Sequence, residues 1–150
     1  MPGPGDLSAL LSRTGVIHWQ QDRPTAALLA AARDAGRRAD ALDLQGVADK
    51  TEFMARCAEA LKLPDWFGRN WDALYDCLTD SDLLPAEDGR LLVVSGWQGY
   101  ADAAPGEWHT ALGVLGDAAA FWEKTDTPLL VLLAEPGVTA PGHPTPGTSG

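Results

Sequence analysis

Two uninterrupted apolar segments of strand length most constrain what this chain can fold into. They are RLLVVSG at residues 90–96 and PLLVLLA at residues 128–134. A strand with one face in water alternates apolar and polar residues, whereas these two segments do not, so both of their faces must be buried. Strands of this kind occur in parallel sheets that helices cover. The two segments therefore predict an α/β protein.

The rest of the chain alternates between strand and helix patterns. Two shorter strand patterns are VIHW at 16–19 and ADALDLQG at 39–46, and four helical patterns cover residues 25–38, 50–63, 71–79 and 107–125. This alternation predicts a small parallel sheet joined by right-handed crossovers, in two or three layers.

The segments between these patterns also carry predictions. Residues 81–89 and 97–107 are expected to form loops, the second one rich in aromatic residues. The last helical pattern contains Gly113 and Gly116. Each glycine costs a helix about 1 kcal/mol relative to alanine, so we expect close packing of that helix at these two positions.

The composition changes at both ends of the chain. The first residues are rich in proline and glycine, and the tail from Glu135 is rich in Pro, Gly, Thr and Ser without an apolar period. We therefore expect a flexible N-terminus at 1–14, a single domain at 15–134 and a disordered tail at 135–150. A chain of 150 residues suits one domain with a sizeable core.

The charge and the cysteines exclude several classes of protein. The net charge of −10 argues against binding to nucleic acid, and it fits either simple solubility or attraction to a basic partner. Cys57 and Cys77 lack metal-binding or redox spacing, so we expect two buried thiols in a reduced, cytoplasmic protein. No signal-peptide pattern and no apolar run of about 18 residues is present, so we expect no membrane association.

The segment DWFGRNWDALYDCLTDSD at 65–82 is the most unusual part of the chain. Asn70 is a good N-cap for a helix whose buried stripe would be Trp71, Leu74 and Leu78. Asp72, Tyr75 and Asp76 then share the opposite face. Two aspartates at i and i+4 repel each other by a few tenths of a kcal/mol. From the residues alone, this face is either simply solvated or a binding face for a positive partner.

Other chemistry finds little support. The three histidines are far apart in the sequence, and Asp80 and Asp82 lack the glycine and glutamate of a calcium loop. Asp72 and Asp76 could approach the spacing of a retaining glycosidase, but catalytic carboxylates usually need a cleft that separates their pKa values. We therefore expect no catalytic residues, no metal and no cofactor, with an enzyme that uses these two aspartates as a remaining alternative.

The segment LPDWFGRNWDALYDCLTD at 63–80 resembles the signature of the barstar family, the intracellular inhibitors of barnase-type ribonucleases. Weaker similarity covers residues 39–133 in the order strand, helix, signature helix, strand, helix, strand. The resemblance implies a small three-stranded parallel sheet flanked by helices, with 39–133 as the family core. Residues 15–38 would then be an extra N-terminal strand–helix unit.

The resemblance also implies a function, a partner and a site. The signature helix and the loop before it would occlude the active site of a ribonuclease, with Asp76 as the central acid that mimics a phosphate. Tyr75 stands where well-known members have tryptophan, and Asp117 would be an acid on the last helix. The implied partner-binding residues are Trp66, Gly68, Asn70, Asp72, Tyr75, Asp76 and Asp117. We expect a monomer that serves in toxin immunity. The alternative is a non-inhibitory module that recognises another basic partner, such as a toxin or a regulator.

Overall fold

The structure is a computed structural model that describes residues 14–20, 25–64, 68–80, 89–125 and 127–135. The predicted flexible N-terminus and disordered tail lie outside these residues, except for Thr14 and Glu135, and stay predictions. The elements, in chain order, are β1 (Gly15–Gln20), α2 (Thr25–Asp34), β2 (Arg38–Asp43), α3 (Lys50–Leu61), α4 (Trp71–Leu78), β3 (Arg90–Ser95), α5 (Gln98–Ala103), α6 (Pro105–Glu123) and β4 (Leu129–Glu135).

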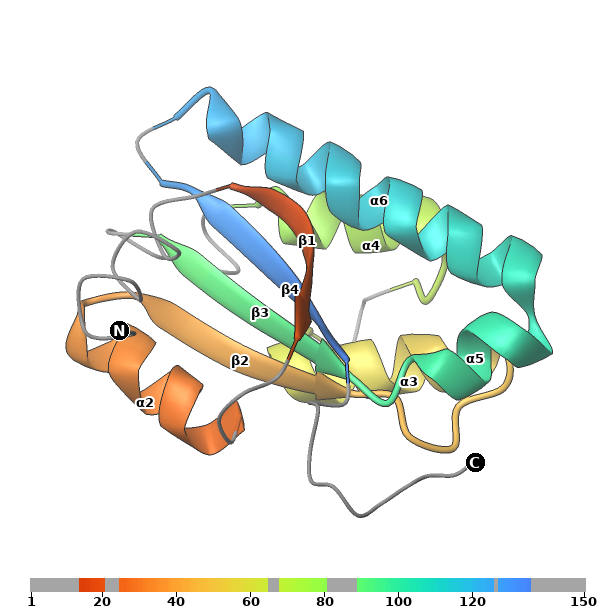
Figure 1. Ribbon diagram of the computed structural model, residues 1–150. Helices are drawn as coiled ribbons and strands as arrows, with labels where there is room; N and C mark the ends of the chain where they lie inside the picture. The colour runs from red at the N-terminus through yellow and green to blue at the C-terminus, as the bar shows by residue number, and fades with distance from the viewer. Residues whose placement is uncertain (1–13, 21–24, 65–67, 81–88, 126, 136–150) are drawn as a thin grey trace, which may run out of the picture.

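The strands form one parallel sheet in the order β1-β4-β3-β2 (Figure 1), which confirms the predicted fold class. The sheet has four strands rather than three, because β1 pairs with β4 from Gly15↔Leu130 to Gln20↔Glu135. The two apolar segments become β3 and β4 in the middle of the sheet. Their central position explains why neither of them alternates between apolar and polar residues.

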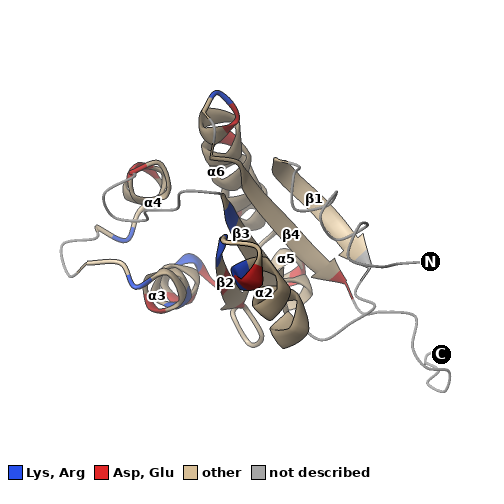
Figure 2. Ribbon diagram, turned by 90° about the vertical axis from the view of Figure 1, so that its left-hand side faces the viewer, with Lys and Arg blue, Asp and Glu red and all other residues tan. Residues whose placement is uncertain are grey.

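Side chains of β3 alternate between two cores on opposite faces of the sheet. Leu92 and Val94 join the larger core with α3, α4, α5 and α6. Leu91 and Val93 join a smaller core with α2. The fold therefore has three layers, and Figure 2 shows α3, α4 and α6 together on one side of the sheet.

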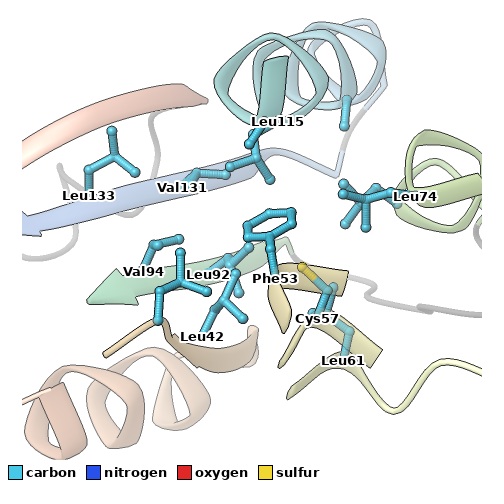
Figure 3. Packing of buried hydrophobic residues seen from close by; sticks show 14 of the residues in the cluster. Leu42, Phe53, Cys57, Leu61, Leu74, Leu92, Val94, Leu115, Val131 and Leu133 are labelled. Carbon is cyan, nitrogen blue, oxygen red and sulfur yellow. The ribbon is translucent and has the colours of Figure 1, made fainter. Parts of the chain in front are cut away.

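Phe53 of α3 lies at the centre of the larger core, where it is fully buried. Figure 3 shows its ring between Leu74 of α4, Leu115 of α6 and Val131 of β4. The ring also stacks on Tyr100, with 5.4 Å between ring centroids. Burying a large apolar side chain contributes about 1.5–3 kcal/mol, so this cluster holds α4 and α6 against the sheet.

Two predictions about helices are wrong in their extent. Most of residues 97–107 belong to α5 and the first turn of α6 rather than to a loop. The cause is tertiary: Tyr100 is buried in the larger core, and its hydroxyl donates a hydrogen bond to Glu107 at 3.1 Å. The helix predicted at 25–38 ends at Asp34, because Gly36 adopts a φ of +84° and closes it with a backbone hydrogen bond from Arg37 to Ala32.

The packing predicted at Gly113 and Gly116 is also wrong. A Cβ atom added at either position would meet nothing within 4 Å. These glycines lie away from the core side of α6, which is formed by Trp108, Ala111, Leu115, Ala118, Ala119 and Trp122. They therefore weaken the helix without allowing a closer approach of a neighbour. No helix within the described ranges is long and apolar enough to cross a membrane.

Candidate functional site

The start of α4 is set by its local sequence. Asn70 is extended, and its Oδ1 accepts a hydrogen bond from the Ala73 N–H at 2.7 Å. Arg69 before it has a left-handed φ of +55°. Asp72 lies in the first turn, where a negative charge interacts favourably with the helix dipole. The predicted capping role of Asn70 is thus visible in the geometry, while its contact with a partner stays a prediction.

The loop before α4 is described only in part. Trp66 lies outside the described residues, so its predicted contact stays a prediction. At Gly68, an added Cβ would lie 3.2 Å from the Asn70 Nδ2 atom. A side chain at Gly68 would therefore press on the residue that caps α4, which is a local reason for glycine besides the predicted approach of a partner.

The end of α4 is attached to both α6 and β3 through one carbonyl. The Leu78 oxygen accepts a hydrogen bond from Trp122 Nε1 at 2.8 Å and another from Arg90 Nη1 at 3.3 Å. The Arg90 guanidinium also lies over the Trp122 ring, 5.2 Å from its centroid. These contacts fix the C-terminal end of α4 relative to the sheet.

Arg90 is an unusual charge to find here, because its side chain is only 4% exposed. Its pKa is lowered to about 10, chiefly by burial and also by the nearby positive charge of Arg38, while Asp40 acts in the opposite direction. Arg90 is still positively charged at neutral pH. It therefore places a cation at the C-terminus of α4, where the helix dipole favours one.

The two faces of α4 differ largely as predicted. Leu74 and Leu78 are buried in the larger core, and Asp72 and Asp76 are exposed. Trp71 is a correction, since it is only partly buried, although it contacts Phe53 with ring centroids 5.7 Å apart. Cys77 instead takes the third buried position. Trp71 can therefore contact solvent or a partner on one side while it packs on the core with the other.

An open groove of about 710 Å³ lies between α4 and α6. Its lining from α4 is Trp71, Asp72, Tyr75 and Asp76, and its lining from α6 and the residue after it is Val114, Asp117, Ala120, Phe121 and Lys124. Four of the residues predicted for partner binding are thus brought together in one place. Asp117 joins the other three although it lies about 40 residues further along the chain.

The charges in the groove are predominantly negative. Asp72, Asp76 and Asp117 are all exposed, and none of them forms an ion pair within the described part of the chain. Among the described residues that line the groove, Lys124 is the one cation. Figure 2 shows α4 with acidic positions and no basic one. The groove can therefore engage cationic groups through charge-assisted hydrogen bonds.

The sequence reasoning missed the other α6 side chains of the groove. Val114 precedes Asp117 by three residues, and Phe121 and Lys124 follow it by four and seven. This helical spacing was a signal in the sequence that they share its face. It did not reveal that this face lies beside α4. That depends on how α6 packs against α4 in the larger core, where Trp122 also donates a hydrogen bond to the Leu78 carbonyl.

The cysteines do not add a reactive centre. Both thiols are free and buried, and burial raises the pKa of Cys57 well above its ordinary value. Burial and the negative charges of Asp76 and Asp80 also raise the pKa of Cys77. Because the thiolate is the nucleophile, both are poor nucleophiles at neutral pH. Among the described residues, no three His, Cys, Asp or Glu side chains gather to hold a metal ion.

Comparison with known families gives a match that covers most of the described elements. The family model described as Barstar (barnase inhibitor) matches residues 37–134, from just before β2 into β4. The match includes both helices that line the groove, whereas β1 and α2 precede it. A search of curated proteins finds no match to the chain. The family is one of inhibitors rather than enzymes. Because its model covers about two thirds of the sequence, the chain belongs to the barstar family.

Proposed function

We propose that this protein binds a barnase-type ribonuclease and inhibits it by covering the active site with its α4–α6 groove. The observation that carries the proposal is the convergence of three exposed carboxylates from two helices, Asp72, Asp76 and Asp117, in one groove of a barstar-family chain. A ribonuclease active site must collect cationic side chains to hold phosphate. Carboxylates on a folded surface can pair with those cations and offer no bond to cleave.

Asp76 is the proposed central acid, and Asp72 is one turn earlier on the same face of α4. Their mutual repulsion slightly destabilises the free protein and is relieved when cations arrive. Tyr75 lies between them and can add a ring and a hydroxyl to the contact. Asp117 approaches from α6, so cations in the groove meet acids on both walls. Trp66 and Gly68 are proposed to contact the enzyme from the loop before α4.

The rigidity of the groove supports the same proposal. α4 is capped at its start by Asn70 and tied at its end through the Leu78 carbonyl. Because the helix is already ordered, less conformational entropy is lost on binding. A surface that is fixed before it meets the enzyme is therefore suited to tight inhibition.

The test is an inhibition titration. Wild type and the Asp76→Ala variant are added to a barnase-type ribonuclease that cleaves a fluorogenic substrate. Wild type is expected to inhibit at stoichiometric amounts. Asp76→Ala is expected to bind roughly 100-fold or more weakly, because leaving a buried cation unpaired costs about 3–5 kcal/mol. Asp102→Ala, which removes an exposed carboxylate from α5 outside the groove, serves as the charge-matched control.

The outcomes separate the alternatives. Equal inhibition by wild type and Asp76→Ala would show that the groove face is not the inhibitory surface. Absence of inhibition by wild type would reject the proposed function. Binding of the enzyme without inhibition would instead support a module that recognises another basic surface.

A further inference from the structure

The α6 side of the groove carries two side chains that are not carboxylates and so cannot mimic a phosphate. Phe121 is 42% exposed, and Lys124 follows it by three residues. Both line the groove together with Asp117. The three residues are spaced i, i+4 and i+7, so they form one stripe along α6 and the C-cap residue that follows it. An acid, an aromatic ring and a base thus follow one another over about 10 Å.

Phe121 lies at the surface in contact with a buried aromatic ring. Its ring packs edge-to-face on Trp122, with 5.2 Å between ring centroids. Trp122 is itself fixed by its hydrogen bond to the Leu78 carbonyl. The lining of the groove also includes the apolar side chains of Trp71, Val114 and Ala120. A rigid aromatic ring of this kind offers contact area at a low cost in conformational entropy.

Lys124 changes the charge pattern at the end of the groove. It forms no ion pair with any carboxylate in the described part of the chain. A partner that is basic throughout would be attracted by the three acids and repelled by Lys124. The charges therefore fit a surface whose sign changes from positive to negative along α6.

We propose that Phe121 and Lys124 determine which ribonuclease is bound. This inference rests on the proposed function of the groove. The partner carries an apolar side chain beside its cationic centre, placed against Phe121, and a carboxylate beyond it that pairs with Lys124. Ribonucleases with the same active-site cations but without these two neighbours leave Phe121 uncovered and give Lys124 no carboxylate to pair with. Selection among related enzymes thus comes from α6, while the acids supply the common attraction.

The test measures dissociation constants for a panel of barnase-type ribonucleases that differ beside the active site. The variants are Phe121→Ala and Lys124→Gln, with Phe121→Tyr and Lys124→Arg as conservative partners. Glu123→Gln is the matched control, since Glu123 is exposed on the same turn and does not line the groove. Asp76→Ala reports whether each enzyme uses the proposed site at all.

For the tightest-binding enzyme, Phe121→Ala is expected to weaken binding roughly tenfold, because the apolar contact area is lost. Lys124→Gln is expected to weaken it roughly threefold at low salt, with the difference fading at high salt. The Tyr, Arg and Glu123→Gln variants should bind almost like wild type. Replacing the partner's carboxylate by an amide should abolish the effect of Lys124→Gln, as a double-mutant cycle would show.

The results distinguish this inference from the function on which it rests. An enzyme that depends on Asp76 but binds Phe121→Ala and Lys124→Gln unchanged would overturn the inference and leave the proposed function intact. If no enzyme binds, or if Asp76→Ala binds like wild type, both fail. If Phe121→Ala converts a dimer to a monomer in light scattering without changing enzyme affinity, a second copy occupies Phe121 and the inference is again wrong.

Discussion

The hydrogen bond from Trp122 to the Leu78 carbonyl gives a sharp test of what positions the binding face. The variant Trp122→Phe keeps an aromatic ring next to Arg90 and removes the indole N–H that bonds Leu78 at 2.8 Å. The Leu78 carbonyl keeps its longer 3.3 Å contact with Arg90. If the bond to Trp122 positions α4, its loss should loosen the helix that carries Asp72 and Asp76.

The expected magnitude follows from two contributions. A buried carbonyl that loses a hydrogen bond costs about 1–3 kcal/mol. Because the Leu78 carbonyl still accepts the hydrogen bond from Arg90, the cost here should lie at the lower end of that range. Trp122 is almost fully buried, so the smaller ring also leaves a cavity that costs about 1 kcal/mol. The free energy of unfolding should therefore fall by about 2–3 kcal/mol. With an m-value of about 2 kcal/mol per molar urea, in the middle of the usual range, the midpoint should fall by roughly 1–1.5 M.

The matched control is Trp97→Phe. Trp97 also donates its indole N–H to a backbone carbonyl, that of Ala134 at 2.9 Å, but it lies at the end of β3 rather than at α4. Urea denaturation should show a lower free energy of unfolding for both variants. Hydrogen exchange should show faster local exchange of α4 amides in Trp122→Phe alone. A loss below about 0.5 kcal/mol in Trp122→Phe, or equal exchange of α4 in the two variants, would refute this account of how α4 is positioned.

Two further predictions concern stability away from the groove. Burial raises the pKa of Tyr100, and the hydrogen bond from Tyr100 to Glu107 also raises it. Above about pH 10, the ordinary pKa of tyrosine, the unfolded chain therefore loses the Tyr100 proton while the folded protein keeps it. Stability should therefore be retained below that pH and fall above it by up to about 1.4 kcal/mol per pH unit, and urea titrations of Tyr100→Phe should show a flatter dependence. Gly113→Ala and Gly116→Ala should each raise the free energy of unfolding by up to about 1 kcal/mol, because the space is open, and a lower melting temperature would contradict the geometry.

Much of the fold could be predicted from periodicity and burial. The apolar runs of β3 and β4 required a covered parallel sheet, and the helical spacing of α4 separated Leu74 and Leu78 from Asp72 and Asp76. These are local patterns, and the structure repeats them. α5 could not be predicted in this way, because its helical state depends on burying Tyr100 among residues distant in the sequence.

The site shows the same division between local and tertiary information. The face of α4 is encoded in eight consecutive residues, Trp71–Leu78, so its acids could be recognised from the sequence. Phe121 and Lys124 lie at the end of α6, and the sequence does not show which exposed face of this helix lies beside α4. Arg90 looks like the ordinary polar start of a strand, although it lies beneath the C-terminus of α4. The sequence therefore did not reveal the side chains whose role depends on how two helices or strands pack against each other.

The N-terminal unit outside the family match has a structural role that follows from the two apolar strands. Leu91 and Val93 point to the face of the sheet opposite the groove helices. Within the described residues, the helical side chains that bury this face come from α2, chiefly Leu28 and Ala32, while β1 adds Ile17 and Trp19 at the edge. An apolar sheet face without cover would promote association with other molecules. The unit therefore completes the core that the strands of the family region require. It does so on the face away from the groove, so one face of the sheet supports stability while the other presents the binding helices.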